Sequence, residues 1–88
     1  MYNGVEYVVG PRKSGYRVKI HVVGDLIVGY YDDVIKAAIA YNKAIDILKK
    51  NGISKDFNAN YVEEINGKVY AQIYSEIEIN ECIYNRRG

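Results

Sequence analysis

Few side chains of this sequence have the types and spacing that catalysis or metal binding requires. His21 is the single histidine and has no partners at the spacing of a zinc ligand set, so we expect no metal site. Cys82 is the single cysteine and has no histidine beside it in the sequence, which argues against a catalytic thiol. No glycine-rich phosphate loop, nucleophile elbow or triad order is present. We therefore expect neither enzymatic activity nor a cofactor.

Two pairs of neighbouring carboxylates have the residue types needed for acid–base work. Asp32 and Asp33 stand where a helix is expected to begin, and the capping of that helix explains them better than catalysis does. Glu63 and Glu64 suit the solvated edge of a hairpin. Neither pair has a second group that would make it a catalytic or metal site.

Positive charge is concentrated near the N-terminus. The chain as a whole carries +1, but residues 1–24 hold Arg12, Lys13, Arg17 and Lys19 against Glu6 alone. Residues 25–66 are net negative, and the charges of residues 67–88 cancel. A local cationic field of this kind attracts anions even when the total charge is close to zero.

The totals describe one small domain. Eighty-eight residues provide a single modest core, and no apolar run reaches the roughly 18 residues of a membrane span. The N-terminus lacks a signal-peptide pattern and one cysteine fits a reducing compartment, so we expect a cytoplasmic protein. Ten tyrosines and no tryptophan suit either half-buried strand positions or an interface.

Three short strands are predicted before residue 32. The segments 7–9, 16–22 and 26–31 are β-prone and are separated by Gly10-Pro11 and by the turn 23–25. In the second segment Tyr16, Val18, Ile20 and Val22 share one face, while Arg17, Lys19 and His21 share the other. This strict alternation predicts a strand that is packed on one side and solvated on the other.

A long helix is predicted to follow the strands. Asp32 is the expected N-cap, and Asn51-Gly52 the expected stop. Between them an apolar stripe with spacings of three and four is formed by Val34, Ala38, Tyr41, Ile45 and Leu48, and is widened by Ala37, Ala44 and Ile47. Phe57, in the loop that follows, is expected to dock under the helix.

A second hairpin is predicted in the C-terminal part. The segments 61–65 and 68–74 flank Asn66-Gly67, a pair typical of a type I′ turn, although residues 61–64 could instead form one helical turn. Apolar side chains alternate on one side of this segment: Val69, Ala71, Ile73, Ile77 and Ile79. Residues 80–88 are expected to be an extended or frayed tail. A β-prone edge invites pairing, so we expect a homodimer whose interface includes Val69, Ile73, Ile77 and Ile79.

The predicted fold is therefore α+β, with a three-stranded antiparallel sheet packed on one long helix and an additional C-terminal β-hairpin or strand. Residues 1–60 form the sheet-plus-helix domain. Residues 61–88 form an extension that belongs to the same compact unit or to a dimer interface.

Four segments carry a more specific pattern than any single motif. Segment 15–20 reads Gly-Tyr-Arg-Val-Lys-Ile, segment 28–32 reads Val-Gly-Tyr-Tyr-Asp, segment 37–44 reads Ala-Ala-Ile-Ala-Tyr-Asn-Lys-Ala, and Phe57-Asn58 follows. Together, over about 50 residues, they resemble the Apetala-two/ethylene-response-factor type of DNA-binding domain, in the degenerate form of its phage and bacterial members. The resemblance implies a sheet backed by a helix, with double-stranded DNA bound on the exposed sheet face.

Carried over by position, the resemblance implies a DNA-binding set of Arg12, Lys13, Arg17, Lys19 and His21. The chain departs from the family in lacking its tryptophans and in having Asp25 and Ile27 on the third strand, where cationic or aromatic residues are usual. We thus expect a small non-enzymatic DNA-binding protein, phage-encoded and regulatory or accessory to recombination. The alternatives are a protein–protein interaction module on the same scaffold that has lost DNA affinity, or a cationic row that is merely a solvated strand face.

Overall fold

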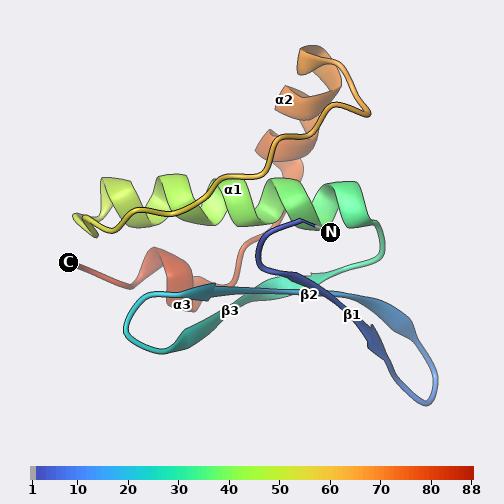
Figure 1. Cartoon of the computed structure of the whole chain (residues 1–88), viewed down its shortest axis with the longest axis horizontal. Coiled ribbons are helices and arrows are strands. Elements are labelled where there is room, and N and C mark those ends of the chain that lie inside the picture. The colour runs from blue at the N-terminus through green and yellow to red at the C-terminus, as the bar shows by residue number, and fades with distance from the viewer. Residues whose placement is uncertain (1) are drawn as a thin grey trace.

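Three strands and one long helix form the body of the protein (Figure 1). The computed structural model describes residues 2–88. In chain order the elements are β1 Val5–Val9, β2 Ser14–His21, β3 Asp25–Tyr31, α1 Val34–Lys50, α2 Gly67–Glu76 and α3 Glu81–Tyr84. The strands are antiparallel in the order β1-β2-β3, and α1 packs across one face of the sheet. The predicted α+β sheet on a long helix is confirmed.

The alternation of β2 divides the sheet into a covered and an uncovered face. Val18 and Ile20 are almost fully buried on the side of α1, while the intervening residues lie on the opposite side. Val18 is opposite Val5 of β1 and Gly29 of β3, and an irregularity after Val18 shifts the register between β2 and β3. The apolar side chains of all three strands thereby meet one helix.

Most of the predicted apolar stripe of α1 is buried, together with Ile39 and Ala40, which the prediction did not include. Its residues Ala38, Tyr41, Ile45 and Leu48 are buried, whereas Val34 is partly buried. The helix ends as expected at Asn51 and Gly52, where Gly52 adopts a φ of 91° that favours glycine. No helix of residues 2–88 is both long and apolar enough to cross a membrane.

The N-cap of α1 lies one residue later than predicted. Asp33, rather than Asp32, has extended backbone (φ −134°, ψ 133°), and its carboxylate accepts a hydrogen bond from the Ile35 N–H at 2.8 Å. Asp32 instead forms an ion pair with Lys36, at 3.5 Å from Oδ1 to Nζ. Two adjacent aspartates are equally good caps by composition, and the backbone conformation decides between them.

The predicted C-terminal hairpin is wrong. Residues 61–65 form neither a strand nor a helical turn, and Asn66 caps α2 by accepting a hydrogen bond from the Val69 N–H at 2.9 Å. The residues Val69, Ile73 and Ile77 are spaced by four, which satisfies a period of 3.6 as well as a period of 2. The alternation was therefore compatible with a helix.

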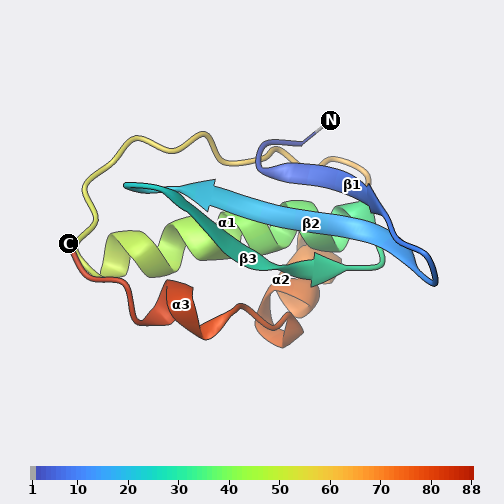
Figure 2. The ribbon, with the colours of Figure 1, turned by 90° about the horizontal axis from the view of Figure 1, so that it is seen from below.

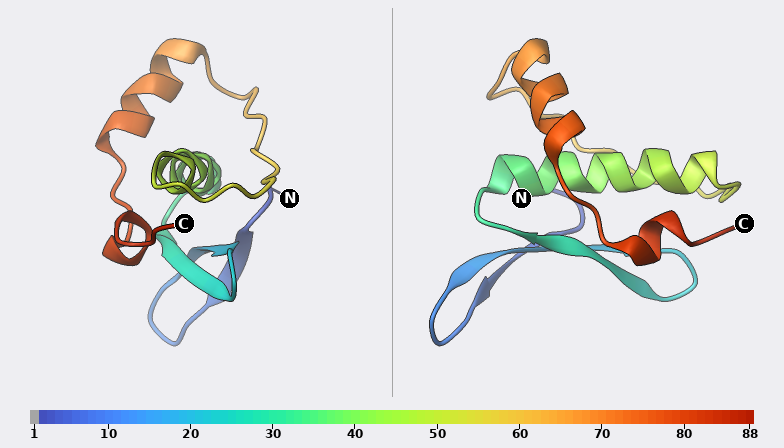
Figure 3. Two further views of the ribbon diagram at one scale, coloured as in Figure 1. Left: turned by 90° about the vertical axis from the view of Figure 1, so that its left-hand side faces the viewer. Right: turned by 180° about the vertical axis from the view of Figure 1, so that it is seen from behind.

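The α2 helix rests on α1 through polar contacts. It contains no buried residue and stands away from the sheet (Figure 3). The Tyr70 hydroxyl accepts a hydrogen bond from Asn42 at 2.9 Å, and the Tyr74 hydroxyl donates one to Asp46 at 2.5 Å. Lys43 donates to the carbonyls of Tyr74 and Ile77 and so neutralises the C-terminal end of α2.

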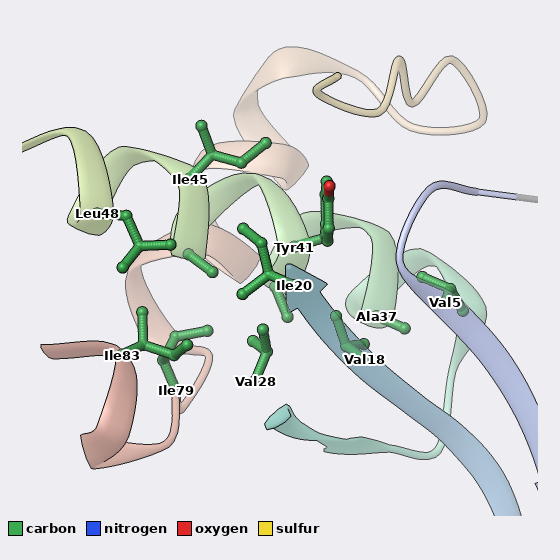
Figure 4. Close-up of a cluster of buried hydrophobic side chains, with 12 residues drawn as sticks. Val5, Val18, Ile20, Val28, Ala37, Tyr41, Ile45, Leu48, Ile79 and Ile83 are labelled. Atoms are coloured by element: carbon green, nitrogen blue, oxygen red, sulfur yellow. The ribbon is translucent and has the colours of Figure 1, made fainter. Parts of the chain in front are cut away.

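The last residues form part of the core rather than a frayed tail, so that prediction is wrong as well. Ile79 is 8% exposed and Ile83, within α3, is fully buried. Figure 4 shows both beside Val28 and Leu48. The Asn80 N–H donates to the Val28 carbonyl at 2.9 Å, which ties this segment to β3. Phe57 also packs against the core, as predicted.

A buried hydrogen-bond network fixes the connection between α1 and α2. The Asn60 N–H donates to Oδ1 of Asn42 at 2.6 Å, and Nδ2 of Asn42 donates back to the Asn60 carbonyl at 2.8 Å. The Asn60 side chain accepts from the Asn3 N–H at 2.6 Å. Because buried amides are costly when unpaired, this reciprocal pairing fixes the loop at Asn60.

Candidate nucleic-acid interface

The face of the sheet opposite α1 has no helix over it (Figure 2). Strand pairing places Glu6 of β1 opposite Arg17 of β2, and Arg17 opposite Tyr30 of β3. Farther along, Lys19 is opposite Ile27, and His21 is opposite Asp25. Tyr30 is 65% exposed. The surface therefore combines cations, two carboxylates and an exposed aromatic ring.

Arg17, Lys19 and His21 of this face each have a carboxylate neighbour. Two nitrogens of the Arg17 guanidinium contact the same Glu6 oxygen, both at 2.5 Å, and Nζ of Lys19 lies 3.5 Å from that oxygen. Asp25 lies 3.1 Å from Nδ1 of His21 and 3.9 Å from Nζ of Lys19. The hydrogen bond from Arg17 lowers the pKa of Glu6, and the charge of Lys19 adds to this effect. Glu6 therefore remains ionised at neutral pH.

Arg12 and Lys13 lie apart from that face, in the exposed turn between β1 and β2 (Figure 2). The Gly10 N–H donates to the Lys13 carbonyl at 3.1 Å and closes the turn. Within residues 2–88 neither side chain has a carboxylate partner within 4.0 Å. The five predicted DNA-binding residues thus form two groups. Three lie on the sheet beside carboxylates, and two lie in the β1–β2 turn without a carboxylate partner among the described residues.

Two participants in this surface were not predicted. Glu6 is a counter-ion for both Arg17 and Lys19, and Tyr30 is the most exposed aromatic side chain on this face. The signal that could have revealed them is strand register. An antiparallel pairing that places Val5 opposite Val18 necessarily places Glu6 opposite Arg17.

The four predicted dimer-interface residues differ in exposure. Val69 is 40% exposed, Ile73 and Ile77 are partly buried, and Ile79 belongs to the core of its own chain. The segment has no strand that could be added to a partner sheet. Homodimerisation and its interface residues therefore stay predictions.

An open groove of about 930 Å³ lies between the β3 edge and the segment that follows α2. Its walls include Tyr16, Gly29, Tyr31, Ile73 and Ile77. The Tyr31 hydroxyl crosses it to donate to the Glu78 carbonyl at 2.6 Å, and burial raises the pKa of Tyr31 from 10.0 to about 12. In the residues described, no three histidine, cysteine or acidic side chains are placed to hold a metal ion.

The shifted pKa of Tyr31 predicts an alkaline loss of stability. The folded chain holds the hydroxyl proton more tightly than the unfolded chain, so this contribution is complete below pH 10 and is lost as the pH rises toward about 12. The urea midpoint of the wild type should therefore fall more steeply across this range than that of Tyr31→Phe. Tyr61→Phe, at an 81% exposed ring, is the control and should follow the wild type. Parallel curves for wild type and Tyr31→Phe would contradict the assignment.

Comparison with protein-family models, with curated proteins and with solved structures finds no match to this chain.

Proposed function

We propose that this protein is a small non-enzymatic DNA-binding module that contacts duplex DNA with the uncovered sheet face and the β1–β2 turn. The observation that carries the proposal is the placement of Arg17, Lys19 and His21 on one face that no helix covers. The antiparallel strands β1 and β2 form a ribbon, and a two-stranded β-ribbon fits the major groove of B-DNA. The turn with Arg12 and Lys13 adds two cations at the end of the same ribbon.

The balance of charge sets the expected strength of binding. The sheet face and the β1–β2 turn together hold four permanent cations, Arg12, Lys13, Arg17 and Lys19, and two carboxylates, Glu6 and Asp25. A positive excess remains, and phosphate contacts from such cations release counter-ions. The ion pairs must rearrange before Arg17 and Lys19 can meet phosphates. We therefore expect modest affinity with a marked dependence on salt.

A duplex titration tests the proposal. Binding of a fluorescent duplex of about 20 base pairs, two helical turns, is measured by anisotropy at several salt concentrations. The amide shifts of Arg12, Lys13, Arg17, Lys19 and His21 are followed in parallel. The double variant Arg17→Gln/Lys19→Gln should bind about tenfold more weakly at low salt. The control Lys36→Gln, at a residue of α1 that is paired with Asp32, should bind like the wild type. Absence of binding at low salt, or an equal loss in both variants, would refute the proposal.

The ion pairs also favour a second candidate, a protein–protein interaction module on the same scaffold. Arg17 and Lys19 already have a carboxylate within 4.0 Å, and Tyr30, opposite Arg17, is exposed. Tyrosine and arginine are enriched at protein interfaces, and Tyr30 lies opposite Arg17 on this face. Failure of the duplex titration, together with binding of a purified partner that Tyr30→Ala abolishes, would select this candidate.

A further inference from the structure

A second group of cations lies at the end of α1. Lys49 and Lys50 close the helix, and Arg86 and Arg87 are brought beside it by the last residues of the chain. The Gly88 N–H donates to the Asn51 carbonyl at 3.1 Å, and Nδ2 of Asn51 donates to the Tyr84 carbonyl at 2.9 Å. Figure 1 shows the C-terminus next to the end of α1. We refer to Lys49, Lys50, Arg86 and Arg87 as the C-terminal cation cluster.

The cluster differs from the sheet face in that its side chains form no ion pair in the described part of the chain. Within residues 2–88, none of its four side chains has a carboxylate within 4.0 Å. Asp46, one turn before Lys50, accepts the hydrogen bond from Tyr74. Glu81 is the acidic residue nearest to the two arginines in the sequence and is not paired with them. Three of the four side chains are exposed, and Arg86 is half-buried.

Helix capping accounts for only half of the cluster. Lysines in the last turn interact favourably with the carbonyl end of a helix, which explains Lys49 and Lys50. It does not explain two arginines carried there by a different segment. One Arg87 nitrogen donates to the Tyr84 carbonyl at 2.7 Å. A guanidinium has five N–H donors, so most of them remain for another acceptor.

The cluster and the β1–β2 turn lie at opposite ends of the molecule (Figures 1 and 2). The longest extent of the chain is 35 Å. Ten base pairs of B-DNA span about 34 Å, so one duplex is long enough to reach both ends. Arginine and lysine together suit a phosphodiester backbone, because arginine binds phosphate oxygens bidentately and lysine binds them as a point charge.

We propose that the C-terminal cation cluster is a second phosphate-contacting surface, which binds the backbone of the same duplex that the sheet face binds. The inference rests on the proposed function and adds a second site to it. Because its cations are unpaired, the cluster contributes more to the salt dependence of binding, per residue, than Arg17 and Lys19 do. The sheet face positions the duplex, and the cluster anchors it at one end.

Matched charge removal tests the inference. Arg86→Gln/Arg87→Gln is compared with Lys36→Gln/Lys68→Gln, which removes the same charge from other surfaces, and with Arg17→Gln/Lys19→Gln from the sheet. Each full-length variant is first checked for a native amide spectrum. With a duplex of about 20 base pairs, the cluster variant should bind about tenfold more weakly, and the slope of log K against log salt should become shallower by about 1 to 2. The control variant Lys36→Gln/Lys68→Gln should leave both the affinity and the salt slope unchanged.

The outcomes separate the two proposals. A cluster variant that retains wild-type affinity and slope, while the sheet variant loses binding, overturns the inference and leaves the proposed function standing. Binding that depends on the cluster but not on the sheet residues overturns the proposed function instead. Binding to vesicles of phosphatidylserine and phosphatidylcholine is measured as well, for the wild type and for the cluster variant. If the cluster variant loses vesicle binding but keeps duplex binding, the cluster is a lipid-binding surface and the inference is wrong.

Discussion

Replacing Ile83 with alanine should lower the free energy of unfolding by about 2–5 kcal/mol, although the residue lies in a single helical turn near the end of the chain. Ile83 is fully buried, and α3 contacts both α1 and β3. Removal of its side chain leaves a cavity in the same core that holds the sheet against α1. Chemical denaturation followed by far-ultraviolet circular dichroism measures the change.

Val69→Ala is the matched control for this substitution. Val69 is an apolar residue of the same C-terminal region, but it is 40% exposed on α2. Its truncation should cost less than about 0.5 kcal/mol. Equal stabilities for wild type and Ile83→Ala would mean that the C-terminal segment is not part of the cooperative unit. A chain ending at Asn60 lacks both Ile79 and Ile83, and we expect it to lose cooperative unfolding.

Replacing Glu6 with glutamine should strengthen duplex binding, opposite to the usual effect of an interface mutation. Glu6 is the carboxylate shared by Arg17 and Lys19, so its neutralisation frees Arg17 for phosphate and leaves Lys19 with Asp25 as its single carboxylate neighbour. Each additional phosphate contact steepens the salt dependence by about 0.9 in slope and raises low-salt affinity several-fold. We expect about a tenfold gain for Glu6→Gln and a further gain for Glu6→Gln/Asp25→Asn.

Glu63→Gln controls for the change in net charge alone. Glu63 is exposed, lies outside the sheet and is not paired with a cation of the sheet face. The Glu63→Gln variant should raise duplex affinity only slightly, and its slope of log K against log salt should match that of the wild type. Weaker binding by Glu6→Gln would show that the carboxylate orients Arg17 for recognition rather than competing with DNA for it.

The sequence was sufficient for the parts of the fold in which local pattern and tertiary structure agree. Val18 and Ile20 alternate with charged residues, and Tyr41, Ile45 and Leu48 share one helical face, so each periodicity allows a single interpretation. The C-terminal part was ambiguous because Asn66 suits both a tight turn and an N-cap. The contacts that fix α2, from Tyr70 to Asn42 and from Tyr74 to Asp46, join residues distant in sequence and are invisible to local pattern.

The candidate interface shows the same limit. The alternation of β2 placed Arg17, Lys19 and His21 on one face correctly. Their neutralisation by Glu6 and Asp25 depends on the registers of two strand pairings, which residue counts do not supply. The C-terminal cation cluster could not be predicted from the sequence for a related reason. In the sequence, Arg86 and Arg87 cancel against nearby glutamates, but the fold carries the arginines to the end of α1.

The manner in which α2 is held divides the C-terminal part into anchored and weakly held stretches. Asn60 is fixed by the buried amide network, and Ile79 is fixed in the core, whereas α2 between them buries no residue. Residues 61–76 can therefore open locally while the sheet and α1 stay folded, and their amides should exchange with solvent first. Over evolutionary time this is also the stretch in which insertions, deletions or a different local structure would disturb the rest of the protein least.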